Sequence, residues 1–335
     1  MVLPAPGSPR MSTTRSGGKP PPIISSKPGI PVDVLGEAVS KLNQPAQYPS
    51  GMHKSFGCAY YDYVCLDRMR DADSTSECTA EPILNQLKTK QFGRTLILLD
   101  ECASTNDAGL KLASNGAPHG SLILAATQTA GRGRHGRRWV SPLGGIWMTL
   151  ILKSPITQPL EALPLIGALS VADSIHNQLG IDSRVRWPND VVVHGSKVAG
   201  LIAEGHQRGN SLEFVLLGIG VNANFESHEI HDRTIDAVTL MELNNGRVDS
   251  SRLVCNILLE LEDLLTLAAS NPPQLLELLR SRDYSTGRTV KVVMEEKVIE
   301  GVFVDYESPN MAVLNSKGQM FVVDSASAIS VDYSN

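Results

Sequence analysis

The sequence predicts an α+β protein in which a larger mixed domain is followed by a small all-β domain. Between about residues 81 and 283, short apolar β-type segments alternate with segments of helical periodicity, a pattern typical of a mixed sheet with flanking helices. From Thr289 the pattern changes to short alternating strands, which indicates a separate all-β unit over residues 284–335. We therefore expect two ordered domains.

Composition narrows the class of protein. A chain of 335 residues with 42% hydrophobic content is long enough to bury a sizeable core. The net charge of -5 argues against a general nucleic-acid binder, and the sequence has no apolar run of the roughly 18 residues that a membrane helix needs. Five widely spaced cysteines without a C-x-x-C pair indicate a reducing, intracellular compartment and no structural zinc.

The composition of the N-terminal region differs from that of the rest of the chain. Residues 1–32 hold eight prolines, four basic residues and no acidic residue, which predicts a disordered tail or a transit peptide. A cytoplasmic protein is expected, with a mitochondrial or plastid location as the alternative. Residues 33–80 form a poorly defined extension in which no helix-turn-helix, and hence no DNA-binding domain, is recognised.

The elements of the larger domain follow from local pattern. Ser104-Thr105-Asn106 can cap a helix that ends near Asn115-Gly116, and a second helix over 160–179 ends at Gly180. Two amphipathic helices are expected at 250–268 and 273–281. The expected strands are 95–100, 121–127, 146–152, 190–193, 197–204 and 212–220.

The loop between the second and third of these strands carries the strongest signal. Gly131 to Gly136 read G-R-G-R-H-G, and four arginines (Arg132, Arg134, Arg137 and Arg138) fall within seven residues. A dinucleotide-binding loop would need a helix next, but Pro142 and a glycine pair follow. A nucleic-acid segment would be longer, and a solvated turn would not need the glycines. Glycine with arginine instead indicates a flexible cationic clamp for an anion.

A second constellation lies at R-W-P-N-D (186–190) and S-K-V-A-G (196–200). Pro188 predicts a turn before a short β-branched strand, and His194-Gly195 can form a tight hairpin connection. Such a hairpin would bring Asn189, Asp190 and Lys197 together. Alone, a lysine at a hairpin is usually a solvated edge residue.

Together these segments resemble the biotin–protein ligases, also called holocarboxylase synthetases. Three further segments agree: Phe92 to Asn106 with its S-T-N turn, Gln128 three residues before Gly131, and L-G-I-G-V-N over 217–222. The resemblance runs from about residue 81 to about residue 330. It implies a class II synthetase-like catalytic domain over 81–283 and an SH3-like β-barrel over 284–335. Arg186 stands where the family more often has lysine.

The resemblance also implies a reaction and its residues. Biotin and ATP, with Mg²⁺, would form biotinyl-5′-AMP, and a lysine of a biotin carboxyl carrier domain of acetyl-CoA carboxylase or a related carboxylase would then accept the biotin. Lys197, Arg132 and Arg134 would be the catalytic cations. The implied biotin site comprises Ser104, Thr105, Asn106, Gln128, Arg132, Gly133, Arg134 and Lys197, and the implied nucleotide site comprises Arg134, Arg137, Lys197 and Asn222.

Several alternatives stay open at this stage. Asp190 would place the carrier lysine, or would only stabilise its turn through an Asx bond. Trp139 and Trp187 are expected to be packing residues, and no protein ligand set for a metal is predicted. A homodimer is compatible with the sequence. A lipoate–protein ligase and a non-enzymatic nucleotide-binding module are the rival functions, and ATP–pyrophosphate exchange with biotin, with lipoate or with neither distinguishes them.

Overall fold

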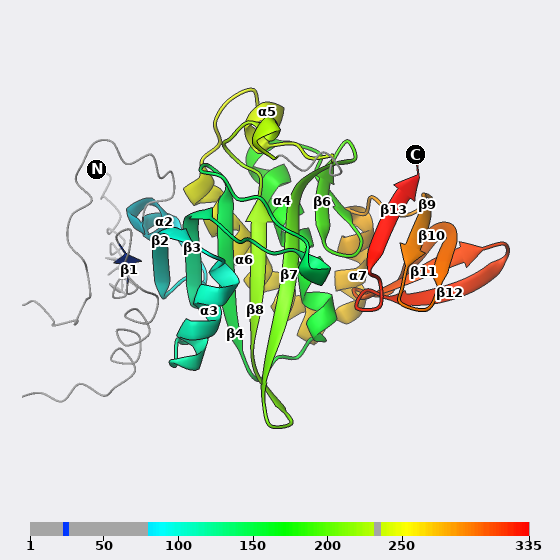
Figure 1. The fold of residues 1–335 in the computed structure, drawn as a ribbon, viewed down its shortest axis with the longest axis horizontal. Helices are drawn as coiled ribbons and strands as arrows, with labels where there is room; N and C mark the ends of the chain where they lie inside the picture. Colours follow the sequence, from blue (N-terminus) through cyan, green and yellow to red (C-terminus); the bar gives the residue numbers. More distant parts are fainter. Residues whose placement is uncertain (1–22, 27–79, 231–235, 335) are drawn as a thin grey trace, which may run out of the picture.

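The computed structural model describes residues 23–26, 80–230 and 236–334 (Figure 1). The helices of the larger domain are α2 (Ala80–Gln86), α3 (Thr105–Ser114), α4 (Leu163–Leu179), α5 (Leu240–Leu243), α6 (Ser250–Ser270) and α7 (Pro272–Ser281). Its strands are β1 (Ile23–Ser26), β2 (Leu96–Cys102), β3 (Leu122–Gln128), β4 (Ile146–Lys153), β5 (Arg184–Arg186), β6 (Asp190–Val193), β7 (Ser196–Arg208) and β8 (Ser211–Val221). Short 3₁₀ turns lie at Arg134–Gly136, Leu160–Ala162 and Ser227–Glu229.

The strands form one eight-stranded mixed sheet in the order β1-β2-β3-β4-β8-β7-β6-β5. The β1–β2 and β2–β3 pairs are parallel, and the other neighbours are antiparallel. All six predicted strands are confirmed with boundary shifts of a few residues. The sequence pattern missed β5, because its three residues R-V-R are too short to show a period.

A four-residue strand lies within the segment that the sequence predicts to be a tail or a transit peptide. Ile23–Ser26 pairs in parallel with β2, with Ile23 opposite Leu96. These four residues contain no proline and begin with two β-branched side chains, so they can complete a ladder at the sheet edge. The predictions for the rest of residues 1–32 and for 33–79 lie outside the described residues.

The four predicted helices are confirmed as α3, α4, α6 and α7, with ends shifted by up to three residues, whereas α2 and α5 were not predicted. The Ser104 side chain caps α3 by accepting from the Asn106 backbone N–H, and α4 ends at Gly180, whose φ of 70° lies in the left-handed region that glycine adopts without strain. Asp249 and Asn271 cap α6 and α7 in the same way as Ser104 caps α3.

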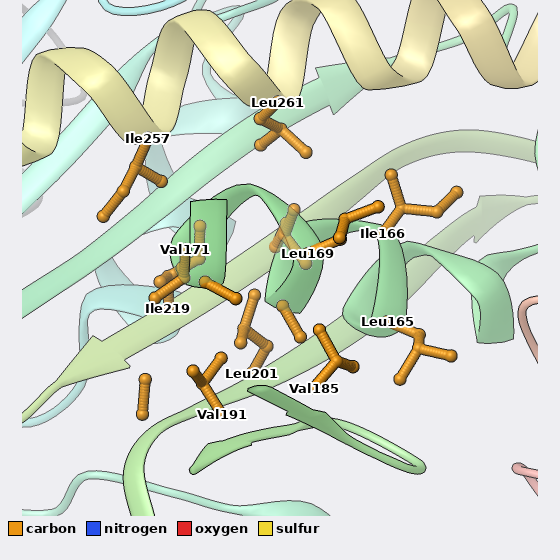
Figure 2. Close-up of a cluster of buried hydrophobic side chains, with 14 of the residues drawn as sticks. Leu165, Ile166, Leu169, Val171, Val185, Val191, Leu201, Ile219, Ile257 and Leu261 are labelled. Carbon is orange, nitrogen blue, oxygen red and sulfur yellow. The ribbon is translucent and has the colours of Figure 1, made fainter. Parts of the chain in front are cut away.

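The sheet is covered on both faces. On one face α4 and α6 pack over the strands, with Leu169 of α4 and Leu261 of α6 above Leu201 of β7 (Figure 2). On the other face α3 packs through Leu112 against a smaller apolar cluster that includes Ile123 and Leu216. The helix α3 covers only part of this second face (Figure 1), and Gly200, Gly218 and Gly220 lie on the central strands β7 and β8. No helix in the described ranges is both long and apolar enough to cross a membrane.

The C-terminal unit is an antiparallel sheet of five strands. These are β9 (Thr289–Val293), β10 (Val298–Ser308), β11 (Met311–Ser316), β12 (Gln319–Asp324) and β13 (Ser330–Ser334), in the order β12-β11-β10-β9-β13. The prediction of a small all-β unit is confirmed. Its buried residues, among them Phe303 and Tyr306, are continuous with the core beneath α4 and α6. The unit therefore packs directly on the larger domain.

Candidate active site

A cavity of about 130 Å³ opens where the N-terminus of α3, the Gly131–Trp139 loop, the β6–β7 hairpin and β13 meet. Its lining contains nearly every residue that the sequence predicts for the site. These are Ser104, Thr105, Asn106, Gln128, Arg132, Gly133, Arg134, Arg137, Asp190 and Lys197. Elements far apart in the sequence thus converge on one hollow.

Three glycines of the sheet make room for this cavity. A Cβ atom on Gly218 would lie 2.6 Å from Asn106 Oδ1, and one on Gly220 would lie 2.6 Å from Trp139 Nε1. A Cβ on Gly200 would lie 2.9 Å from the Lys197 Cε atom. The glycines of V-A-G and L-G-I-G-V-N therefore allow polar side chains to lie directly on the sheet.

The arginine-rich loop is a hairpin-like excursion. Bridges pair Gln128 with Ser141 and Arg132 with Arg138, and His135 at the tip has a φ of 54°. No helix follows β3, which agrees with rejecting a dinucleotide-binding loop. All four arginines line the cavity, as a clamp requires.

Three of these arginines are already bonded to protein groups. Arg132 donates to Asp107 at 2.7 Å, and this bond raises its pKa. Arg134 donates to the carbonyls of Ser325 and Ala328, and Arg137 donates to the carbonyl of Ile329. Burial lowers the pKa of Arg134. The loop is therefore held against the C-terminal unit.

Lys197 lies beside a buried carboxylate. Its Nζ is 2.6 Å from Asp190 Oδ1, and Arg186 contacts the other oxygen, Oδ2, at 3.0 Å. Only 15% of each of the Lys197 and Asp190 side chains is exposed. Burial acts to raise the Asp190 pKa, but the two cations together outweigh it, so the pKa lies below its ordinary value. The predicted proximity of Asp190 and Lys197 is confirmed.

The S-T-N turn supplies a neutral polar corner. Ser104, Thr105 and Asn106 are each 4% exposed. The Thr105 backbone N–H donates to Gln128 Oε1 at 2.8 Å, while Gln128 Nε2 donates to Ser141. Buried amides and hydroxyls of this kind suit a ligand with both donors and acceptors.

Asn222 is the predicted site residue that the cavity does not include. It is 2% exposed, and its amide donates to the carbonyls of Lys197 and Val238 at 3.3 Å. It thus holds the backbone of Lys197, and its role toward a nucleotide stays a prediction.

Two tryptophans line the cavity, and each has a buried Nε1 without a hydrogen-bond partner among the described residues. Trp187 is 1% exposed and its ring packs near Phe303, as expected of a core residue. Trp139, also expected to pack, lines the cavity with its ring centroid 5.0 Å from Lys197 Nζ, and its buried Nε1 has no partner among the described residues. A cation over an indole face is an attractive arrangement. Trp139 is therefore part of the site.

Tyr333 of β13 is a site residue that the sequence did not indicate. It lines the cavity, and its hydroxyl donates to the Trp187 carbonyl at 2.7 Å. Ser285 accepts from the Trp187 backbone N–H at 3.1 Å. The backbone N–H and the backbone carbonyl of Trp187 are therefore both bonded to the chain beyond α7. No motif marks Tyr333, because its position follows only from how β13 packs.

Known proteins resemble this chain over the same region. Residues 100–222 match the model of the Biotin/lipoate A/B protein ligase family. The biotin–[acetyl-CoA-carboxylase] ligase of Mycobacterium tuberculosis is 30% identical over 244 residues, 70% of this chain and 89% of that protein. The chain belongs to the biotin protein ligase family. This membership agrees with the resemblance that the motifs around the cavity indicate.

Two further relatives bear on the extent of the likeness. The bifunctional ligase/repressor BirA of Bacillus spizizenii is 38% identical over 178 residues, which is 52% of this chain and about half (54%) of that protein. The Aquifex aeolicus biotin protein ligase in complex with biotin and ATP has a TM-score of 0.63 and 28% identity, covering 72% of this chain and 99% of its own. The shared fold thus includes the larger domain and the C-terminal sheet.

Replacing Asp190 tests the charge balance of the site. Asp190→Asn leaves Arg186 and Lys197 without their shared anion, so it should lower the free energy of unfolding at pH 7 by about 2–4 kcal/mol. Because the folded-state pKa is depressed, the carboxylate stabilises the protein above its ordinary pKa of 3.8, and this contribution is lost as the pH falls below it.

The measurement is urea unfolding between pH 7 and about pH 3.5, where the difference between wild type and variant should shrink. Asp332→Asn is the control, since Asp332 is an exposed carboxylate on β13. A constant difference across this pH range would contradict the assigned pKa direction.

Proposed function

We propose that this protein attaches biotin to a lysine of a biotin carboxyl carrier domain by way of biotinyl-5′-AMP. The observation that carries the proposal is one cavity holding both a neutral polar corner at Ser104–Asn106 and a cationic wall with Lys197 and the loop arginines. The corner suits a cyclic urea, and the wall suits a carboxylate beside a phosphate. The names of the relatives support the same activity.

The first step would join two anions. A biotin carboxylate oxygen attacks the α-phosphorus of ATP, a new O–P bond forms, and pyrophosphate leaves. The Lys197 ammonium has three N–H donors and forms an ion pair with Asp190, and it would still have N–H donors to offer to the carboxylate and the α-phosphate. Preorganised positive charge of this kind is usually the largest catalytic contribution.

The second step would transfer the acyl group. The neutral amine of the carrier lysine attacks the acyl carbon, an amide forms, AMP leaves with the electrons of the broken C–O bond, and the proton lost by the nitrogen passes to the leaving phosphate or to water. Asp190 is bonded to two cations and has a depressed pKa, so it is a weak base. It would place the Lys197 ammonium and the incoming amine rather than remove a proton.

Mg²⁺ would accompany the nucleotide. This ion keeps several waters and binds through phosphates with one or two carboxylates, sharing the phosphate charge. The described ranges contain no group of three or more His, Cys, Asp or Glu side chains placed to hold a metal. The triphosphate and water would hold this ion.

The compartment and the partner are part of the proposal. Cys102 and Cys255, the cysteines of the described residues, are free thiols, which supports a reducing compartment such as the cytoplasm. The carboxylase named in the mycobacterial relative supports acetyl-CoA carboxylase as the source of the carrier domain.

The deciding experiment is ATP–pyrophosphate exchange with biotin, with lipoate and with neither. Exchange that depends on biotin supports the proposal, whereas exchange that depends on lipoate indicates a lipoate–protein ligase. Nucleotide binding without exchange would indicate a non-enzymatic module.

Removing the Lys197 ammonium should lower biotin-dependent exchange by about 10²–10³-fold, the usual effect of losing one preorganised donor. The variant is Lys197→Ala, and Lys291→Ala on the exposed face of β9 is the control, which should exchange like wild type. Unchanged exchange in Lys197→Ala would remove this residue from the reaction.

The loop arginine contacts generate a prediction about retention of the adenylate. Arg134→Gly removes the bonds to Ser325 and Ala328, so the loop should release biotinyl-5′-AMP early, and the released adenylate should label bystander proteins. Arg208→Gly, at an exposed end of β7, is the control. Labelling confined to the carrier domain would show that another element retains the adenylate.

Tyr333 should act on the reaction through the W-P-N-D segment. Tyr333→Phe removes the hydrogen bond to the Trp187 carbonyl. Trp187 lies three residues before Asp190, whose carboxylate forms the ion pair with Lys197. Loss of one hydrogen bond should lower the kcat of exchange about three- to tenfold, with biotin Kd changed less than about twofold. Tyr284→Phe is the control. An equal effect on Kd and kcat would contradict a role in placing Lys197.

A further inference from the structure

Thr149 is a buried hydroxyl in an otherwise apolar strand. It lies in the middle of β4, I-W-M-T-L-I-L-K, and is 0% exposed. A buried hydroxyl without a partner costs about 1–3 kcal/mol, so its presence here needs an explanation. Gly109 of α3 lies against its methyl group, which leaves the hydroxyl facing the start of the helix.

The Thr149 hydroxyl touches two residues of the polar corner. Its Oγ1 lies 2.6 Å from Asn106 Oδ1 and 2.8 Å from Thr105 Oγ1. A hydroxyl has only one proton, and Asn106 Oδ1 can only accept. The Thr149 proton therefore goes to Asn106, and the single proton of the Thr105 hydroxyl is shared between Thr149 and Gln128 Oε1, which lies 3.1 Å away.

This proton order fixes what the corner presents to a ligand. The Asn106 amide oxygen is held by Thr149 and lies close to Gly218, where any Cβ would be 2.6 Å away. Its Nδ2 is buried without a partner in the described residues, while Asn106 lines the cavity. Thr105, whose proton is directed to Gln128 or to Thr149, keeps a lone pair to accept with. The corner thus offers a donor at Asn106 beside an acceptor at Thr105.

We infer that Thr149 is a positioning residue that sets ligand specificity by fixing the Asn106 amide with its nitrogen toward the cavity. A donor beside an acceptor complements a cyclic urea, which presents a carbonyl oxygen beside an N–H. A cyclic guanidine presents N–H groups at both places and would leave Asn106 Nδ2 facing another donor. This inference rests on the proposed function, because it takes biotin as the ligand.

The test compares biotin with 2′-iminobiotin, in which a guanidine replaces the urea, by calorimetry on the full chain. Thr149→Val keeps the volume and removes the hydroxyl, so the Asn106 amide is free to turn its oxygen toward the cavity. The ratio of the two affinities should fall by about tenfold or more, equivalent to about 1.4 kcal/mol. Thr149→Ser keeps the hydroxyl and should hold the ratio within about threefold of wild type.

Each outcome decides a separate point. If wild type does not bind biotin, both the proposed function and this inference are overturned. If wild type binds biotin and Thr149→Val keeps the wild-type ratio, only the positioning role is overturned. A fall in the ratio of the biotin and 2′-iminobiotin affinities in Thr149→Ser would also overturn the positioning role, because this variant keeps the hydroxyl. If Thr149→Val does not fold, Thr149→Ala makes the same comparison without a hydroxyl.

Discussion

The site depends on one buried carboxylate. Asp190 lies between Arg186 and Lys197, with one oxygen toward each cation. Without it, two positive charges would repel each other in a partly buried hollow. With it, the three groups carry one net positive charge, and the Lys197 ammonium keeps a fixed direction. These atoms are kept in place by the β6–β7 hairpin, by the turn at Pro188 and by the sheet glycines Gly200, Gly218 and Gly220 beside the cavity.

The C-terminal unit contributes to the same arrangement from outside the larger domain. Ser285 and Tyr333 bond both polar groups of the Trp187 backbone, and the Arg186 guanidinium lies 5.7 Å from the centroid of the Tyr333 ring. Because the backbone next to Asp190 is tied to this unit, the position of Lys197 depends on how the two units pack. The C-terminal unit is therefore a structural part of the site rather than an appended module.

Sequence reasoning was sufficient for residues whose chemistry or turn geometry is local. The S-T-N cap, the His194-Gly195 hairpin and the glycine-arginine loop were all predicted, because each depends on neighbours in the chain. Tyr333, Trp139 and Thr149 were not predicted as site residues. Their roles arise from packing between distant segments, and only Thr149 carries a local sign, as a hydroxyl in an apolar strand. The edge strand at Ile23–Ser26 was missed because the surrounding prolines dominate the composition.

The loop arginines show how the site can hold cations in place and still give them to a ligand. Arg134 and Arg137 donate to neutral backbone carbonyls, and Arg132 pairs with partly exposed carboxylates. Bonds from a guanidinium to a phosphate or carboxylate ligand join two charged groups and can be bidentate, so they are stronger than its bonds to a neutral carbonyl. An anionic adenylate in the cavity would therefore compete well for Arg134 and Arg137. Arg137 would give up only an exposed bond to the Ile329 carbonyl, which water can replace. Arg134 would uncover the carbonyls of Ser325 and Ala328, two buried residues, so Arg137 is the cation that the site gives up more easily.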